Sequence, residues 1–554
     1  MRRFLFVFLA LVVSFAAAAA EAPRLPAAAI ASAHPLATRA GHEILSQGGN
    51  AFDAAVAVAA TLAVVEPANS GLGGGGFWLL HRASDTYEVM IDGRERAPLK
   101  ARAGMYLDKD GEVVPRLSLD GPLAAAIPGT PAALDYLARR YGRLPLGQSL
   151  APAIRLAREG FPVSERFTQM AEARRAALAS SPAAAAVFLD DGFPPAPGFM
   201  LKQPDLADTL ERLAAKGRDG FYTGPVARRL VKGVRRAGGI WSRRDLREYS
   251  VVERTPIVGT YRGVRVVSAP PPSSGGVALV QMLNLLAPYS LDPMHRTRRD
   301  HLIIQAMKLA YRDRARHLGD PDFVTVDVAR LTGGRYAAEL GREIDLPKWQ
   351  IPPLMPTREQ GTQTTHFSII DRDGNRAAVT LSLNTLFGSG FMPPGTGVLL
   401  NNEMDDFVAK PGVPNAYGLV GNAANAIAPG KRPLSSMTPT FLESPDAVVI
   451  LGTPGGSRII SMVLLASLEF LHHRGGVRDW LALPRFHHQY LPDTVYYEPG
   501  AYAEAEVEQL GRLGHHLQAV DRPYGNMQAI VWYKNAGRVE AASDPRGEGL
   551  ALAQ

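Results

Sequence analysis

The 554-residue sequence contains no cysteine, so the protein has no disulfide, no thiolate nucleophile and no cysteine-bound metal. It also lacks any run of lysine or arginine. Its 60 basic and 53 acidic residues give a formal net charge of +7 without a basic stripe. We therefore expect no nucleic-acid partner. A mildly basic surface instead suits an anionic small substrate.

Long hydrophobic runs are absent outside the N-terminus. Met1-Arg2-Arg3, the apolar run 4–15 and the alanines 16–20 have the composition of a cleavable signal peptide. We expect residues 1–20 to be removed and the protein to be periplasmic or secreted. A membrane anchor is the alternative, but the apolar run is short and ends in alanines. No later segment is apolar over the ~20 residues of a spanning helix, so no span is expected after signal removal.

The N-terminal region predicts a layered α+β core. Residues 34–49 predict a helix, and 54–65 predict a helix apolar on all sides and therefore buried, capped by Asn50 or Asp53. The glycine-rich loop 71–76 precedes the strand 77–80. It lacks the lysine of a P-loop and the spacing of a dinucleotide site, so we expect tight packing beside a site and no nucleotide cofactor. Residues 120–345 are predicted to be mostly helical, with helices at 130–141, 150–159, 205–216 and 277–286.

A loop-like segment, residues 342–363, ends at Gln363-Thr364-Thr365. The residues that follow predict a β-hairpin, with strands at 367–370 and 377–383. A threonine pair at a strand start is, by itself, typical of ordinary strand propensity. Cutting the chain before Thr364, however, would give this threonine a free α-amino group that can act as the base for its own hydroxyl.

Further motifs follow in a fixed order along the chain. With the glycine-rich loop and Thr364-Thr365-His366, their ordered set resembles the gamma-glutamyltransferase (gamma-glutamyltranspeptidase) family of N-terminal nucleophile hydrolases. The likeness extends over essentially the whole chain after the signal peptide. The motifs that carry it are 92–98, 270–276, 382–388, 400–407, 431–437, 452–458, 485–489 and 543–546.

The resemblance implies an α+β fold, a four-layer αββα sandwich with no metal or cofactor. It also implies that the precursor cuts itself between Gln363 and Thr364. The products would be a large subunit, residues 21–363 including the linker 342–363, and a small subunit, residues 364–554. The two subunits would stay associated and form one intertwined globular unit.

The same resemblance assigns the site. Thr364 is the expected nucleophile, with the hydroxyls of Thr365 and Ser382 beside it and an oxyanion hole at Gly455 and Gly456. Many relatives have threonine where this chain has Ser382, which lacks the methyl group that restrains the rotamer. The other expected groups bind the donor: Arg94, Ser435 and Ser436 its carboxylate, Asn384, Glu403 and Asp406 its ammonium, and Tyr417 closes a lid over it.

The implied function is cleavage of the γ-glutamyl bond of glutathione and related donors, with transfer to water, amino acids or dipeptides. A cephalosporin (glutaryl) acylase of the same fold is an alternative; it would keep the nucleophile but relax the ammonium contacts. An inactive exported binding protein is a third reading. Taken individually, Arg94 also fits a surface ion pair, and Glu403 and Asp406 fit a solvated turn. We interpret the adjacent His487 and His488 as structural, since neighbours on a strand face opposite ways.

Overall fold

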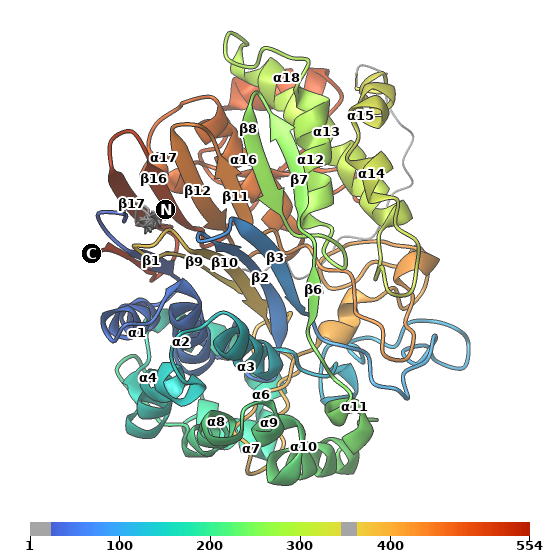
Figure 1. Ribbon diagram of the computed structural model, residues 1–554. Coiled ribbons are helices and arrows are strands. Elements are labelled where there is room, and N and C mark those ends of the chain that lie inside the picture. The colour runs from blue at the N-terminus through green and yellow to red at the C-terminus, as the bar shows by residue number, and fades with distance from the viewer. Residues whose placement is uncertain (1–23, 345–362) are drawn as a thin grey trace, which may run out of the picture.

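The computed structural model describes residues 24–344 and 363–554 (Figure 1). The expected signal peptide and most of the expected linker lie outside these residues. Among the helices of the described residues, none combines the length and the apolar character needed to cross a membrane.

Two large antiparallel sheets form the centre of the molecule (Figure 1). The seven-stranded sheet has the order β18 (Leu550–Ala553), β1 (Ala29–Ser32), β9 (Thr365–Ile370), β10 (Arg376–Ser382), β2 (Gly75–Arg82), β3 (Tyr87–Gly93), β6 (Val252–Arg254). The six-stranded sheet has the order β17 (Arg538–Ser543), β16 (Gln528–Tyr533), β12 (Ala447–Gly452), β11 (Thr440–Glu443), β8 (Val264–Ser268), β7 (Ile257–Tyr261). Smaller sheets pair β4 (Phe161–Pro162) with β5 (Met200–Leu201), and join β13 (Phe486–His487), β14 (Val495–Tyr497) and β15 (Leu517–Ala519).

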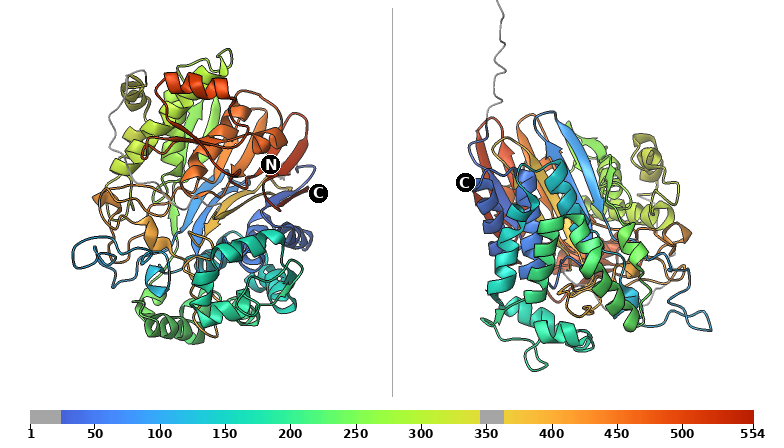
Figure 2. Two further views of the ribbon diagram at one scale, coloured as in Figure 1. Left: turned by 180° about the vertical axis from the view of Figure 1, so that it is seen from behind. Right: turned by 60° about the horizontal axis from the view of Figure 1, so that its bottom comes forward.

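Helices cover the outer face of each large sheet (Figures 1 and 2). Beside the seven-stranded sheet lie α1 (Pro35–Ser46), α2 (Ala51–Val65), α3 (Thr130–Arg140) and α4 (Leu146–Glu159), extended by α5 (Glu165–Ala173), α6 (Arg175–Ala179), α7 (Pro182–Phe188), α8 (Pro204–Lys216), α9 (Arg218–Tyr222), α10 (Gly224–Arg236) and α11 (Arg243–Arg247). Beside the six-stranded sheet lie α12 (Gly275–Leu286), α13 (Arg296–His317), α16 (Ile459–Leu471) and α17 (Val477–Ala482), with α14 (Val328–Leu331), α15 (Gly334–Gly341) and α18 (Glu504–Arg512) further out. This arrangement confirms the expected four-layer αββα sandwich.

The strands near the middle are buried on both faces because each has a layer on either side. In β2, Phe77 and Leu79 belong to the core between the sheets, whereas Trp78 and Leu80 pack toward the first helix layer. The adjacent helix α2 is buried along its whole length, as its sequence predicts. Asn50 caps it and forms a reciprocal capping box with Asp53.

The prediction that residues 120–345 are mostly helical missed five strands: the two-residue strands β4 and β5, and three strands of the large sheets, β6, β7 and β8. The last three have only 3, 5 and 5 residues. Strand β6 pairs with the distant β3 and β8 with the distant β11, whereas β7 pairs with its neighbour β8. Segments this short give little periodic signal in the sequence, so long-range pairing decides their structure.

The predicted hairpin β9–β10 is confirmed and lies in the middle of the seven-stranded sheet. Strand β9 pairs with β1, and β10 pairs with β2. Strands from after Thr364 therefore lie between strands from before it, β1 on one side and β2 on the other. This placement puts Thr364, the residue before β9, at the end of two central strands, where loops from both parts of the chain converge.

Candidate active site at Thr364

Thr364 has an unusual backbone conformation for a β-branched residue, with φ of +93°. Such a conformation costs on the order of 1–3 kcal/mol and persists only where the surroundings enforce it. The side chain is buried, and its Oγ1 lies 3.0 Å from Ser382 Oγ. The backbone N–H of Asn384 donates to the same Ser382 oxygen over 2.7 Å. Hydrogen bonds therefore hold the Ser382 side chain that lacks the restraining methyl group of threonine.

The carbonyl group of Gln363 is already held by the loop after β12. The backbone N–H of Gly455 donates to Gln363 O over 3.1 Å, so it contacts the carbonyl that Thr364 would attack. Gly455 has φ of +141°, and a Cβ there would lie 2.5 Å from Met462 Cε. A Cβ on Gly456, at φ of +57°, would lie 2.4 Å from the Tyr417 ring. Both positions therefore require glycine.

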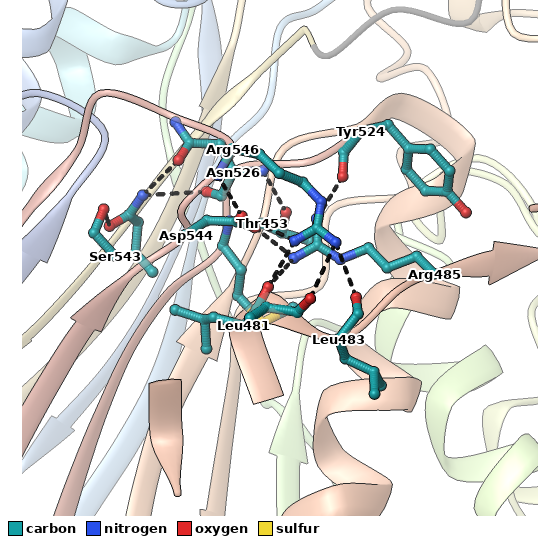
Figure 3. Close-up of polar contacts among 12 residues, drawn as sticks. Thr453, Leu481, Leu483, Arg485, Tyr524, Asn526, Ser543, Asp544 and Arg546 are labelled. Carbon is teal, nitrogen blue, oxygen red and sulfur yellow. Dashed lines mark hydrogen bonds and ion pairs between the residues drawn. The ribbon is translucent and has the colours of Figure 1, made fainter. Parts of the chain in front are cut away.

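A buried polar network lies beside this glycine loop (Figure 3). The Asp544 carboxylate pairs with Arg485 and Arg546 and accepts the backbone N–H of Met527. One residue earlier, the backbone N–H of Asn526 donates to Thr453 Oγ1 over 3.3 Å. The C-terminal motif 543–546 thus fixes the strand that borders Thr453 and, through it, the path of the Gly455 loop.

Arg94 lies beneath the same site and is only 1% exposed, so the surface ion-pair interpretation is wrong. Its Nη1 lies 2.7 Å from Glu403 Oε2, and its Nη2 pairs with Asp406. Its Nε donates to the carbonyl of Pro433 over 3.1 Å. Glu403 is also fully buried, which excludes a solvated acidic turn at that residue.

Acidic side chains outnumber basic side chains around Arg94. Three carboxylates face this one guanidinium, because Glu95 Oε2 lies 3.7 Å from Nη1 on its other side. Burial raises the pKa of Glu95 to about 8 and raises the pKa of Glu403 well above its usual range, opposed by Arg94. Although Glu403 is close to Arg94, neither of its oxygens accepts a well-aligned hydrogen bond within the described residues. An added cation would therefore be favoured here.

These groups surround one cleft of about 290 Å³. Tyr417 closes one side: its hydroxyl donates to Asn384 O over 2.6 Å, and its own carbonyl accepts from Gln489. The predicted residues that line the cleft are Arg94, Thr364, Ser382, Asn384, Glu403, Asp406, Tyr417, Ser435, Ser436 and Gly456.

Thr365 does not line this cleft. It follows Thr364 on the strand and faces the first helix layer, where its hydroxyl approaches Glu66 without a well-aligned hydrogen bond in the described structure. Burial raises the pKa of Glu66 to about 7, and the Thr365 hydroxyl opposes that rise. The Thr365 side chain therefore points away from the cleft and does not lie beside the Thr364 hydroxyl, because side chains alternate along a strand.

His487 and His488 contact different partners, as their alternation predicts. His487 bonds to Ser461 and Gln489, and His488 pairs with Asp493. Within residues 24–344 and 363–554 no group of three or more histidine, aspartate or glutamate side chains is arranged to hold a metal. Sequence reasoning assigned no role to other residues near the cleft, namely Glu95, Arg314, Leu419, Met437, Ser457 and Ile459. Glu95, Met437 and Ser457 had a signal, because they lie within the motifs 92–98, 431–437 and 452–458, whereas the other three lie outside these motifs.

Comparisons with known proteins agree with this geometry. The family model for gamma-glutamyltranspeptidase matches residues 37–554. The chain is 43% identical to a glutathione hydrolase proenzyme of Pseudomonas sp. (strain A14), covering 94% of this chain and 93% of the relative. It is 42% identical to one from Escherichia coli (strain K12), covering 93% and 90%. A cephalosporin acylase from Bacillus halodurans superposes with a TM-score of 0.83 at 28% identity, covering 100% of this chain and 98% of the acylase. The chain belongs to the gamma-glutamyltranspeptidase family.

Proposed function

We propose that this chain cuts itself between Gln363 and Thr364 and then acts as a γ-glutamyl transferase and hydrolase. The observation that carries the proposal is the arrangement at the predicted cleavage site. The Gln363 carbonyl accepts the Gly455 N–H, and the hydroxyl of the next residue, Thr364, is paired to Ser382. The strained φ of Thr364 supports the same reading, since cleavage of its peptide bond would release that strain.

The proposed maturation conserves every atom. The Thr364 hydroxyl loses its proton toward Ser382 and its oxygen attacks the Gln363 carbonyl carbon. The C–N bond then breaks, the nitrogen takes up a proton, and the acyl group of Gln363 is left as an ester on Thr364. Water hydrolyses this ester, giving a carboxylate at Gln363 and a free α-amino group and hydroxyl at Thr364.

In turnover the freed α-amino group serves as the base. Its ordinary pKa of ~7.7 lets it accept the hydroxyl proton near neutral pH. Thr364 would attack the γ-amide carbon of the donor and expel an amine, which leaves with the transferred proton. The γ-glutamyl group of the resulting ester would then be transferred to water, an amino acid or a dipeptide, and Thr364 would be released. Backbone N–H groups at Gly455 and Gly456 would stabilise the oxyanion, and losing such a donor typically costs ~100-fold or more.

The charges in the cleft favour a donor head group that carries an ammonium ion. Three acidic side chains contact Arg94, so a bound ammonium would stabilise their ionised forms. Ser435, Ser436 and Arg94 would take the donor carboxylate, displacing part of the contact between Arg94 and Asp406. Glutathione is the donor that we propose first, because the relatives at 42–43% identity are glutathione hydrolase proenzymes.

A glutaryl acylase is the second candidate, and the full-length structural match to a cephalosporin acylase is the observation that favours it. A glutaryl group keeps the carboxylate of a glutamyl group but lacks its ammonium. It would add no cation beside Glu403 and Asp406, which would then share Arg94 alone. We therefore rank γ-glutamyl donors first.

Intact mass under denaturing conditions tests the maturation step. Two chains that meet between Gln363 and Thr364 are expected for the wild type, and one chain for Thr364→Ala, because one hydroxyl serves both steps. Cleavage of Thr364→Ala at the wild-type rate would sink the assignment of the nucleophile. An uncut, inactive wild type that still binds glutamate would instead support the binding-protein alternative.

Matched anilide substrates test the donor. Initial rates with γ-glutamyl-p-nitroanilide are expected to exceed those with glutaryl-p-nitroanilide, and the reverse order would favour the acylase. We further propose that the chain acts after export, in the periplasm or outside the cell, on the basis of the N-terminal signal sequence. The N-terminal sequence of the secreted protein tests this.

A further inference from the structure

Arg314 is a buried arginine behind Ser435 and Ser436, the serine pair that lines the cleft. It lies on α13, is 5% exposed, and was not singled out by any sequence motif. Its Nε donates to Ser274 Oγ over 3.0 Å, and its Nη2 donates to Ser436 Oγ over 3.3 Å. It forms no ion pair with any carboxylate of the described residues, in contrast to Arg94, which faces three.

The hydrogen-bond roles at the serine pair follow from what each partner is able to donate. A guanidinium group only donates, so Ser436 Oγ accepts from Arg314 and keeps its own proton available. The same holds for Ser435, whose Oγ accepts the backbone N–H of Met437 over 3.1 Å. Neither hydroxyl donates a hydrogen bond to another described residue. Since both line the cleft, two O–H donors are available to a ligand there.

The serine pair is also fixed in place from the same side. Ser274, the other partner of Arg314, donates through both Oγ and its backbone N–H to the carbonyl of Ser435, over 2.7 and 2.9 Å. Ser435 N–H in turn donates to the carbonyl of Pro272 over 2.8 Å. Arg314 and Ser274 thus hold Ser435 and Ser436 in place through main-chain and side-chain contacts. The two serine side chains therefore lose little rotamer freedom when a ligand binds.

Arg314 adds a positive charge beside the serine pair. Three acidic side chains, Glu95, Glu403 and Asp406, contact Arg94, whereas Arg314 is buried without an ion-pair partner among the described residues. Burial and the nearby Arg94 lower the pKa of Arg314, an effect that Asp406 opposes. An arginine remains protonated under such conditions, so this charge persists beside Ser436.

We propose that Arg314 is a positioning residue that holds the Ser436 hydroxyl as a hydrogen-bond donor and supplies a buried positive charge behind it. It would thereby select donors that carry an α-carboxylate beside their α-ammonium. This inference rests on the proposed function, since it concerns how the same cleft recognises the γ-glutamyl group. Arg314 acts on the ligand through Ser436, so it contributes to affinity for the carboxylate and not to the chemical step.

Direct binding separates this role from catalysis. Isothermal titration of the processed protein with L-glutamate and with 4-aminobutyrate, which lacks the α-carboxylate, measures the clamp without turnover. Arg314→Met is expected to raise the Kd of L-glutamate ~10-fold to ~100-fold, the range for losing hydrogen bonds to a charged group, and to change the Kd of 4-aminobutyrate less than about twofold. Arg314→Lys keeps a donor and the charge, and is expected to restore most of the affinity.

A double-mutant cycle shows whether Arg314 works through Ser436. Ser436→Ala should weaken glutamate binding by itself, and Arg314→Met added to it should then weaken binding several-fold less than it does in the wild type. Equal weakening of both ligands, or full additivity with Ser436→Ala, would overturn the proposal. If Arg314→Met fails to mature, the ratio of the Kd of L-glutamate to the Kd of 4-aminobutyrate, measured for Arg314→Lys and Ser436→Ala, provides the same test. Failure of the proposed function would appear separately, as absent turnover of γ-glutamyl-p-nitroanilide by the wild type.

Discussion

Replacing Glu403 with glutamine is expected to weaken γ-glutamyl donors selectively. Glu403 is fully buried, lines the cleft, and has carboxylate oxygens that accept no well-aligned hydrogen bond from the described residues. Its Oε2 lies 2.7 Å from Arg94 Nη1, so Oε1 is the oxygen that a donor ammonium group would contact. Glutamine keeps the shape and one acceptor oxygen but removes the charge, so a charge-assisted hydrogen bond becomes a neutral one.

The size of the effect follows from the charge of the lost contact. A hydrogen bond to a charged group contributes about 1.5–3 kcal/mol. At 1.4 kcal/mol for each factor of ten, Glu403→Gln should raise KM for γ-glutamyl-p-nitroanilide ~10-fold to ~100-fold. KM for glutaryl-p-nitroanilide, which has no ammonium group, should stay the same or fall, because the variant no longer buries an unmatched carboxylate.

The pH dependence has a defined sign. Burial raises the pKa of Glu403, so at low pH the empty site holds a neutral carboxyl group that binds ammonium poorly. KM for the γ-glutamyl donor should therefore fall as pH rises through the pKa of Glu403, and this limb of the profile should be missing in Glu403→Gln. Burial also raises the pKa of Glu95, so the Glu95→Gln profile checks that the limb belongs to Glu403.

Glu95→Gln is the matched control for affinity as well. It removes a carboxylate from the same arginine, 3.7 Å from Nη1, but at a residue that does not line the cleft. A several-fold smaller rise in KM is expected, measured by initial rates on variants whose cleavage has been verified by mass. Equal losses on the two anilide substrates, or equal losses in the two variants, would refute direct ammonium binding by Glu403.

Three further predictions concern the nucleophile and its surroundings. Ser382→Ala should slow cleavage before Thr364 ~10-fold or more, since it removes the group that receives the hydroxyl proton, whereas Ser382→Thr should mature normally. Cleavage followed over time on gels would contradict this if the alanine variant were cut at the wild-type rate. Gly455→Ala should slow both cleavage and turnover ~100-fold, because its Cβ would lie 2.5 Å from Met462 Cε and displace the N–H; wild-type kinetics would rule out that N–H as a donor. Burial lowers the pKa of His366 to about 3, so the unfolded chain binds the extra proton below about pH 6.5 and the folded protein loses stability as pH falls from there. His366→Gln should lower Tm and the free energy of unfolding at pH 7.5. The difference in free energy of unfolding between wild type and variant should then narrow by about 1.4 kcal/mol per pH unit below about pH 6.5, and a constant difference would contradict the assignment.

Local patterns made the centre of this site predictable. Loop, strand, turn and strand follow one another around Thr364, so the hairpin β9–β10 is readable from neighbouring residues alone. The uniformly apolar helix α2 is equally readable, because it is buried on every side. The strands β6, β7 and β8 were not, since they are short, and β6 and β8 pair with the distant strands β3 and β11.

The environment of individual side chains was less predictable. Arg94 fits an exposed ion pair or a buried clamp equally well in sequence, and only packing shows that it is buried against Glu403 and Asp406. Thr365 seemed to belong beside the nucleophile, but strand alternation directs it to the other face. The cleavage and the roles of the site residues remain predictions for the experiments above.

The sequence by itself determined the family, the hairpin β9–β10 and the buried helix α2, because these depend on local periodicity and on contiguous motifs. It also predicts Thr364 as the nucleophile. Only the tertiary structure decided which charges meet. Arg94, Glu403 and Arg314 lie far apart in the chain, and folding places one arginine among carboxylates and the other behind a serine pair. Electrostatic interactions depend on distance through space and on burial, and the separation of two residues along the sequence determines neither.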